Sequence, residues 1–287
     1  MSAKQHDLSG RRAVITGAAR GIGALTARRL HERGARVALL GLEPELLEQV
    51  AAECGGAPWF ECDVADREAV EEAVAGAVEA LGGLDIAIAN AGVGAQLPLV
   101  GGDPEIFDQT IAVNLTGTYN LIHAAGPHIS HPEGYFLLTS SLATAVHGPL
   151  MAAYSASKAA VEALGNTLRQ ELRPSGARAG VAYFAELDTD MTTRAFATKA
   201  ARLMPIGGHG HLPVSPVEPA IDALEKGIAT RARRIVYPPW GTALLVARMG
   251  VQRLAERVVR RNVAKSLELA REEHAPLTTP QPERTPR

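Results

Sequence analysis

Cysteine is scarce in this chain, with two residues in a sequence of 287. Cys54 and Cys62 cannot build a disulfide framework, and neither belongs to a Cys-x-x-Cys pair of the kind that binds zinc. We therefore expect two small buried hydrophobic side chains in a protein of a reducing compartment.

Aromatic residues are also few, and positive and negative charges nearly balance. Phe, Trp and Tyr make up 4% of the chain, which is too few for a stacking platform along single-stranded nucleic acid. The 29 Lys and Arg residues nearly balance 31 Asp and Glu, for a formal net charge of -2. This balance excludes the strong positive field of a nucleic-acid-binding protein, so no nucleic-acid partner is expected.

No targeting segment or membrane helix is evident. Residues 1–9 lack the apolar core of a secretory signal. Residues 134–157 contain no Asp, Glu, Lys or Arg, but Ser, Thr, His147, Gly148 and Pro149 interrupt this stretch. A strand, a loop and the start of a helix explain it better than a membrane span. The expected location is therefore the cytoplasm.

What the sequence does contain is an alternation of short apolar runs and helical patterns. Apolar runs predict strands at residues 12–16, 36–40, 59–62, 84–89, 135–139 and 181–184, and helical spacing predicts helices at 21–33, about 46–50, 67–81, 103–125 and 152–173. Strand–helix repeats with almost wholly apolar strands indicate a parallel sheet covered on both faces. The right-handed crossover rule then predicts an α/β, doubly wound, Rossmann-like fold.

The pattern weakens after residue 195. A loop at 203–219, a helix at 219–230 and a last strand at 234–237 are expected. We predict one domain over 1–240 with a substrate loop at about 190–218, a basic amphipathic helical extension at 241–274, and a disordered tail at 275–287. Such an extension can contact an anionic membrane surface, but packing on its own domain or on a neighbouring subunit is the favoured interpretation.

A glycine-rich turn joins the first expected strand to the first helix. It reads Thr16-Gly17-Ala18-Ala19-Arg20-Gly21-Ile22-Gly23, with the spacing G-x-x-x-G-x-G. Glycines there allow the backbone to approach a pyrophosphate at the helix N-terminus. Any tight strand-to-helix turn also favours glycine, so this motif alone does not establish a pyrophosphate site.

A phenol and an ammonium group share one face of a later helix. Tyr154 and Lys158 are four residues apart, which aligns their side chains. A cation beside a phenol lowers the pKa of the phenol and suits it to proton transfer between an alcohol and a ketone. Such pairs also occur on ordinary surface helices.

Together these motifs resemble the short-chain dehydrogenase/reductase family, in its short single-domain branch, over about residues 8–237. The resemblance rests on residues that occur in the family's order and spacing. They are the glycine turn, Asp63-Val64, Asn90-Ala91-Gly92, Asn114, Ser140-Ser141, and Tyr154 with Lys158. Ser141 precedes Tyr154 by thirteen residues, the family spacing, and is therefore preferred to Ser140.

The resemblance implies a role for each group. Tyr154 would exchange a proton with the substrate oxygen, Ser141 would hydrogen-bond that oxygen, and Lys158 would bind the nicotinamide ribose. Asn114 would hold a water molecule in a proton relay, and Asp63 would contact the adenine. Asn90 and Asn114 could instead only tie strands and helices together. The implied coenzyme-binding residues are Gly17, Arg20, Gly21, Ile22, Gly23, Asp63, Val64, Asn90, Gly92, Tyr154, Lys158 and Thr189.

Two positions depart from the family pattern. Gly41 ends the second strand, where an acidic residue would select NAD. The choice of coenzyme therefore depends on two nearby residues: Arg20 could bind a 2′-phosphate, and Glu43 could repel one. The sequence slightly favours NADP over NAD. Phe184-Ala185 replaces the usual Pro-Gly pair, although Thr189 matches the family.

The substrate end of the site is expected to be apolar. Leu142, His147 and Met151 are the candidate substrate contacts, and their neighbours are mostly hydrophobic, which predicts a lipophilic carbonyl compound or secondary alcohol. His209 and His211 have no carboxylate or Cys partner at ligand spacing, so no metal site is expected.

The sequence thus predicts an NAD(P)-dependent oxidoreductase that interconverts a secondary alcohol and a ketone. One alternative is a non-catalytic nucleotide-binding sensor or scaffold, against which the intact Ser141, Tyr154 and Lys158 argue. Another is a sugar-nucleotide epimerase or dehydratase, which needs a larger C-terminal domain. The helices expected at 103–125 and 152–173 resemble the family's dimer interface, so a homodimer or homotetramer is expected.

Overall fold

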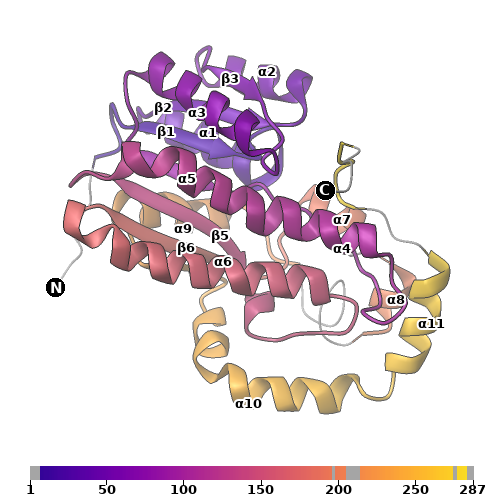
Figure 1. The fold of residues 1–287 in the computed structure, drawn as a ribbon. Helices are drawn as coiled ribbons and strands as arrows, with labels where there is room; N and C mark the ends of the chain where they lie inside the picture. Colours follow the sequence, from indigo (N-terminus) through magenta and orange to yellow (C-terminus); the bar gives the residue numbers. More distant parts are fainter. Residues whose placement is uncertain (1–6, 196–197, 205–213, 274–276, 283–287) are drawn as a thin grey trace.

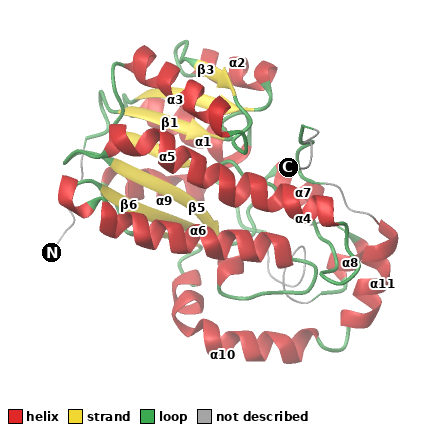
Figure 2. Ribbon diagram, in the orientation of Figure 1, coloured by secondary structure: helices red, strands yellow, loops and turns green. Residues whose placement is uncertain are grey.

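The computed structural model describes residues 7–195, 198–204, 214–273 and 277–282. Its described residues form a seven-stranded parallel sheet in the order β3-β2-β1-β4-β5-β6-β7 (Figures 1 and 2). The strands are β1 (Arg12–Thr16), β2 (Arg36–Gly41), β3 (Trp59–Glu61), β4 (Ile86–Ala89), β5 (Tyr135–Ser141), β6 (Arg178–Phe184) and β7 (Arg234–Tyr237). The order reverses direction between β1 and β4, as in a doubly wound fold, and the predicted fold class is confirmed.

Helices cover both faces of this sheet (Figure 2). One face carries α1 (Gly21–Glu32), α2 (Pro44–Glu53) and α9 (Glu218–Ala229), and the other carries α3 (Arg67–Leu81), α5 (Gly117–Ile129) and α6 (Ala152–Glu171). Successive strand residues point to opposite faces: Val14 packs in one core and Ile15 in the other. Both faces being covered explains why the strands read as continuous apolar runs.

The expected helix at 103–125 is divided in the structure. It begins at α4 (Pro104–Ile111), where the Asp103 carboxylate caps the first turn by accepting from the amide of Glu105. A π-helical turn follows at Ala112–Thr116, and α5 continues to Ile129. Apolar periodicity does not detect one extra residue in a turn, but such π turns recur at functional sites, and this one contains Asn114.

The C-terminal part is less regular. Short helices α7 (Asp190–Ala195) and α8 (Lys199–Arg202) precede α9, and α10 (Gly241–Val259) and α11 (Val263–Glu273) follow β7. In Figure 1, α10 runs below α6 and leads to α11, which packs on α8. Disorder was expected from residue 275 onward, yet Thr278 is buried and bonded to Gly94. No helix within the described residues is long and apolar enough to cross a membrane.

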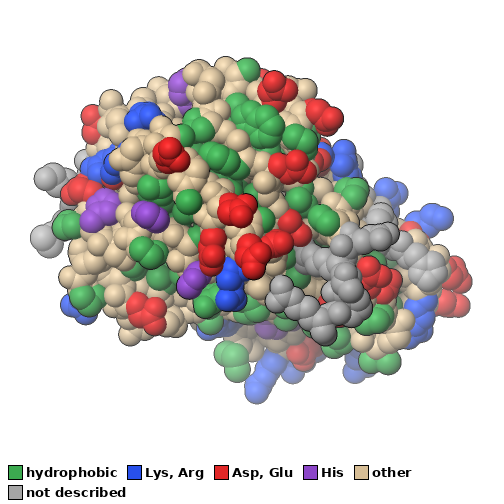
Figure 3. Space-filling view, turned by 45° about the horizontal axis from the view of Figure 1, so that its top comes forward, with side chains coloured by type: hydrophobic (Ala, Val, Ile, Leu, Met, Phe, Trp, Pro, Cys, Tyr) green, Lys and Arg blue, Asp and Glu red, His purple; other side chains and the backbone are tan. Residues whose placement is uncertain are grey.

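The surface carries charges of both signs, and the two cysteines are buried as expected. On the face shown in Figure 3, acidic and basic side chains are interspersed with hydrophobic ones. Cys54 and Cys62 are both buried and free. Burial raises the pKa of Cys54 to about 11 and that of Cys62 to about 12, because a thiolate there would lose its hydration.

Candidate active site

The glycine turn folds tightly over the end of β4. Gly17 has a φ of 64°, a left-handed conformation that favours glycine. A Cβ atom at Gly23 would lie 2.1 Å from the Gly17 carbonyl oxygen, so no other residue fits there. Asn90 holds the turn, because its Nδ2 donates to the carbonyl oxygens of Thr16 at 3.1 Å and Gly17 at 3.2 Å. This is the tying role that the sequence left open for Asn90.

The N-terminus of α1 faces the same turn. Its N-cap residue, Arg20, makes no side-chain cap, so the cap supplies no side-chain acceptor for the first amide groups of the helix. Free amides and the helix dipole together favour an anion at this point. The residues of the turn therefore form a cradle that fits a pyrophosphate.

Arg20 is paired with two carboxylates. Its Nε lies 2.8 Å from Glu43 Oε2, its Nη2 also contacts Glu43 Oε1, and its Nη1 lies 3.1 Å from Asp190 Oδ2. All three residues line the same cavity as Gly41. The positive charge of Arg20 is thus paired with carboxylates and is not left unpaired for an anionic ligand in the cavity.

Asp63 takes part in the turn after β3. Its Oδ1 accepts from the amide of Ala65 at 2.9 Å, which is a local Asx-type contact. The neighbouring Cys62 and Val64 line the cavity, whereas Asp63 is not among its lining residues. The expected adenine contact of Asp63 therefore stays a prediction.

Asn114 is fully buried in the π-helical turn. Its Oδ1 accepts from the amide of Val93 at 2.8 Å, and its Nδ2 donates to the Val93 carbonyl at 2.9 Å and to Ser157 Oγ at 3.0 Å. These bonds join the π-helical turn, α6 and the loop after β4. Asn114 is a structural tie in this arrangement, and the water relay expected for it stays a prediction.

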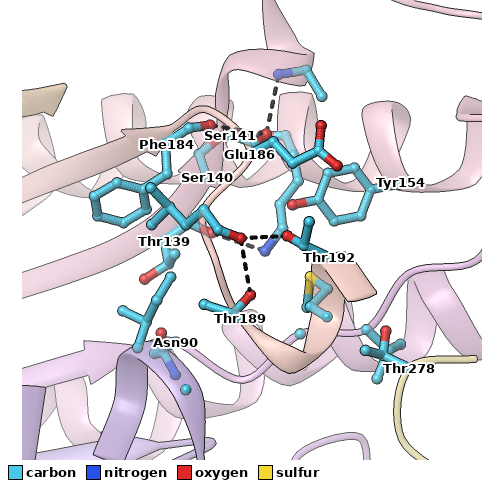
Figure 4. Close-up of a pocket in the computed structure, with 18 of the residues that line it drawn as sticks. Asn90, Thr139, Ser140, Ser141, Tyr154, Phe184, Glu186, Thr189, Thr192 and Thr278 are labelled. Carbon is cyan, nitrogen blue, oxygen red and sulfur yellow. Dashed lines mark hydrogen bonds between the residues drawn. The ribbon is translucent and has the colours of Figure 1, made fainter. Parts of the chain in front are cut away.

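Ser141, Tyr154 and Lys158 line one cavity. Figure 4 shows the side chains of Ser141 and Tyr154 on the same side of it. Ser141 is the last residue of β5, and its Oγ accepts from the amide of Ala143 at 3.1 Å. Lys158 is buried on α6, where its Nζ donates to the Thr139 carbonyl at 3.0 Å and lies 5.7 Å from the centroid of the Tyr154 ring.

Burial shifts both ionisable groups toward their neutral forms. It lowers the pKa of Lys158 to about 8. Burial also raises the pKa of Tyr154, and the hydrogen bond from Ser141 opposes this shift. We expected Lys158 to lower the pKa of Tyr154, but loss of hydration of the phenolate outweighs any such effect in this structure. A negative charge on Tyr154 therefore requires additional stabilisation.

The cavity extends from the glycine turn past Tyr154 and has a volume of about 610 Å³. Of the expected substrate contacts, Leu142 and Met151 line it. His147 does not: its side chain is exposed, and its main chain bonds to Gln252 of α10. Thr189 lines the cavity, and its Oγ1 lies 3.5 Å from the Leu187 carbonyl oxygen.

Sequence reasoning missed part of the cavity wall. Glu186 follows β6 and lines the cavity beside Ser141, and α10 and the C-terminal segment add further residues. The apolar stripe on α10 was visible in the sequence, but nothing there indicated where the helix would pack. No sequence signal marked the C-terminal segment. These added lining residues are Trp240, Leu244, Val251, Leu254, Ala255, Val258, Thr278, Thr279 and Gln281.

Metal ligands are not clustered in the described part of the chain. No group of three or more His, Cys, Asp or Glu side chains there is arranged to hold an ion. His209 and His211 lie outside the described residues.

Comparisons with known proteins agree with the geometry. Residues 11–200 match the short chain dehydrogenase family. Tropinone reductase-like 1 from Erythroxylum coca is 37% identical over 177 residues, which cover 60% of this chain and 65% of that protein. The match thus spans just under two thirds of the first two curated relatives.

Solved structures show the same fold. A dehydrogenase/reductase from Sinorhizobium meliloti 1021 superposes with a TM-score of 0.69 and 30% identity, over 80% of this chain and 95% of that one. A short chain dehydrogenase/reductase from Burkholderia phymatum, in complex with NAD, has a TM-score of 0.74 and 24% identity over 86% and 96% of the two chains, a likeness of fold alone. On the family match and the shared architecture, this chain belongs to the short-chain dehydrogenase/reductase family.

Proposed function

We propose that this protein is an NAD(P)-dependent oxidoreductase that interconverts a secondary alcohol and a ketone on a lipophilic small molecule. One observation carries the proposal: Ser141, Tyr154 and Lys158 line the same cavity as the glycine cradle. The cradle suits a dinucleotide pyrophosphate, and the wall beyond Tyr154 is mostly apolar. The same cavity thus suits a coenzyme and a substrate side by side.

The residues at the cradle fit a nicotinamide dinucleotide. Gly17 and Gly21 line the cradle, and Gly23 lets the turn close tightly on the Gly17 carbonyl. Gly92, Thr189 and Lys158 line the path toward Tyr154. A bound nicotinamide would supply the hydride acceptor or donor. The protein orients both partners and excludes water from between them.

The proton chemistry is assigned to the chain's own side chains. In oxidation, Tyr154 Oη takes the proton of the substrate hydroxyl, and in reduction it returns a proton to the same oxygen. Ser141 Oγ donates a hydrogen bond to that oxygen and fixes its position. The hydrogen bond from Ser141 opposes the effect of burial on the pKa of Tyr154. A protonated Lys158 beside the ring would further favour the phenolate.

Within this function, we propose NAD as the preferred coenzyme. The sequence slightly favoured NADP because Arg20 could meet a 2′-phosphate. That arginine is already engaged by Glu43 and Asp190. A phosphate would have to displace Glu43 and tolerate its charge, whereas a ribose hydroxyl can donate to a carboxylate.

The test is a comparison of Tyr154→Phe with the wild-type protein. With NAD and a panel of lipophilic secondary alcohols, the wild type should form NADH, and the variant should lose turnover by about 10³-fold or more, since it lacks the acid–base group. NADH binding, followed by its fluorescence, should change less than about threefold. Near-normal turnover in the variant would contradict the mechanism.

We also propose that the protein assembles as a homodimer or homotetramer through the outer faces of α4, α5 and α6. Tyr119 on α5 is a large hydrophobic side chain that stays 43% exposed, as expected of a residue at such a face. Light scattering coupled to size exclusion should give the mass of two or four chains, and Tyr119→Glu should lower it. A mass of one chain for the wild type would contradict this proposal.

A further inference from the structure

The outer face of α10, formed by Val246, Met249, Gly250, Arg253 and Arg257, points away from the rest of the described chain. In Figure 1 the helix forms the lower edge of the molecule, and only three of its nineteen residues are buried. Val246 and Met249, three residues apart and so on one helix face, are 78% and 82% exposed. A Cβ atom added at Gly250 would meet nothing within 4 Å. Two large hydrophobic side chains therefore stand in open solvent on this face.

The same helix is rich in arginine. Arg253 lies four residues after Met249, and Arg257 four after Arg253, so both share the outer face, and both are exposed. From residue 241 to 261 the charged residues are Arg248, Arg253, Arg257, Arg260, Arg261 and a single acid, Glu256. Arg248 reaches Glu162 of α6 at 3.4 Å, but in the described part of the chain none of the other four arginines has a carboxylate at ion-pair distance. Because α11 adds two basic and three acidic residues, the positive excess belongs to α10.

The mouth of the cavity lies along one edge of the outer face. Trp240, Leu254 and Val258 line the cavity and are still about half exposed. Side chains that both line a cavity and remain exposed lie at its rim. Leu254 directly follows Arg253 along the helix, and Val258 directly follows Arg257. The rim of the cavity is therefore next to the exposed arginines.

This combination of side chains fits an anionic lipid surface. Guanidinium groups are attracted by negative headgroups, and exposed apolar side chains can enter the boundary between headgroups and acyl chains. A nucleic acid would use the charge alone and would leave Val246 and Met249 in water. Tryptophan is enriched at membrane–water interfaces, and Trp240 stands at the rim of the cavity.

We propose that α10 docks along its outer face on a membrane surface that contains anionic lipid, with the mouth of the cavity against the lipid. The sequence favoured packing of the extension on the protein itself. The inner side of α10 packs in that way, and the outer face is left for the membrane. Docking is independent of the proposed reaction. Only its use, the entry of a lipophilic substrate from the bilayer into the cavity, rests on the proposed function.

Vesicle binding by the full-length protein tests this surface. Sucrose-loaded vesicles of phosphatidylcholine, alone or with about 30 mol% phosphatidylserine, are sedimented with the protein, and the bound fraction is followed against lipid concentration. The wild type should bind the anionic vesicles at least about tenfold more tightly than the neutral ones. Raising the salt concentration from about 0.1 M to about 0.5 M should remove most of this difference, because the arginines are exposed and screened.

Two double variants separate charge from apolar contact. Arg253→Glu with Arg257→Glu should reduce the preference for anionic vesicles to within about twofold. Val246→Ser with Met249→Ser should weaken binding to anionic vesicles about tenfold, because less apolar surface enters the lipid, and should keep the preference for negative charge.

A control makes the same charge change elsewhere. Arg173→Glu with Arg178→Glu alters exposed positions at the amino end of β6, at the edge of the sheet opposite the cavity, and should bind vesicles like the wild type. Unchanged far-UV circular dichroism in each double variant establishes that the helices are retained.

The orientation of the docked protein has its own readout. The chain has two tryptophans, so Trp59→Phe leaves Trp240 as the remaining one. When this variant binds anionic vesicles whose lipids carry bromine on the acyl chains, the fluorescence of Trp240 should be strongly quenched. Vesicles without bromine should shift its emission to shorter wavelength.

The outcomes separate this inference from the proposed reaction. No binding to anionic vesicles, equal binding to both kinds, a preference that survives Arg253→Glu with Arg257→Glu, or bound protein in which Trp240 is not quenched overturns the proposal. A fall in mass by light scattering in Val246→Ser with Met249→Ser also overturns it, because a second copy of the chain would then cover this face. Charge-dependent binding with quenching supports it, even if no ketone is reduced. Failure of reduction counts against the proposed function alone, because vesicle binding needs neither coenzyme nor substrate.

Discussion

The seven-stranded sheet and the two helices that follow β7, α10 and α11, are built in different ways. Strands β1 and β4 are almost entirely buried, and their main chains are bonded to neighbouring strands on both sides. By contrast, α10 buries three of its nineteen residues. The helices after β7 are therefore fixed by far less buried apolar surface than the central strands.

Specific polar contacts compensate in the C-terminal region. The Glu273 carboxylate accepts from the amides of Lys199 at 2.7 Å and Ala200 at 3.0 Å, and Ser266 Oγ donates to the Ala200 carbonyl at 2.8 Å. Thr278 adds three bonds to Gly94 beside the site, two through its hydroxyl and one through its amide. The comparison teaches that the proposed chemistry lies on the buried sheet and its covering helices, which we call the rigid part. The α10 and C-terminal residues that line the cavity form a loosely attached part, held to the rigid part by a few polar contacts.

The largest effect on the free energy of unfolding is expected from the buried charge of Lys158, in the rigid part. Burial places the pKa of Lys158 at about 8 in the folded protein, below its ordinary value of 10.5. Between these pH values the unfolded chain holds a proton that the folded chain lacks, so the free energy of unfolding rises with pH. Below pH 8 the full penalty, about 3 kcal/mol, is present.

Lys158→Met removes this penalty. In urea unfolding, the variant should gain stability relative to wild type at pH 7, and the gain should shrink by about 2 kcal/mol toward pH 9.5. Lys226→Met, at an exposed position on α9, is the control and should show no such trend. A difference between Lys158→Met and wild type that stays constant with pH would refute the buried charge.

The next effect concerns the close approach within the cradle. In Gly23→Ala the new Cβ would press on the Gly17 carbonyl and on Asn90, so the variant should lose about 2 kcal/mol of stability and bind NADH at least about tenfold more weakly. Gly126→Ala, on α5 with open space around it, should cause neither loss. Wild-type NADH affinity in Gly23→Ala would show that the rigid part does not form the coenzyme site.

A smaller effect should separate the two coenzymes. Glu43→Gln removes the charge that pairs with Arg20, which then becomes available to a 2′-phosphate. The ratio of NADPH to NADH affinity should rise about tenfold, as measured by fluorescence titration. Glu45→Gln, two residues further along the chain and exposed on α2, should leave the ratio unchanged. An unchanged ratio in Glu43→Gln would contradict the preference for NAD.

The smallest effect is expected in the loosely attached part. Thr278→Val keeps the volume of the side chain but deletes its hydroxyl bonds to Gly94, a loss of about 1 kcal/mol. KM for an alcohol substrate should rise about threefold to fivefold while NADH affinity stays the same. Thr242→Val, exposed on α10, is the control. A loss of NADH affinity in Thr278→Val would mean that the two parts are not separable.

Sequence reasoning succeeded where local pattern and burial coincide. The helix at Arg67–Leu81 and the strand at Arg12–Thr16 have the predicted bounds, because apolar spacing, the Asp66 cap and the left-handed Gly82 all act locally. Ser141, Tyr154 and Lys158 line one cavity as expected, since the end of β5 and the helix after it pack on each other.

It failed where distant segments decide the structure. His147 lies outside the cavity because its loop is bonded to Gln252, more than a hundred residues away. The segment around Thr278 packs beside Gly94 through contacts that leave no periodic pattern. The π-helical turn around Asn114 depends on its bonds to Val93 and Ser157, which helical spacing alone does not reveal.

The central claim is that the rigid part holds a nicotinamide dinucleotide beside Tyr154. Titration of the wild-type protein with NADH and, separately, with NADPH, followed by coenzyme fluorescence, tests this most directly. We predict saturable binding of NADH that is tighter than that of NADPH. Folded protein that binds neither would contradict the claim, and would mean that Gly41 and Phe184-Ala185, where this chain departs from its family, have abolished the site.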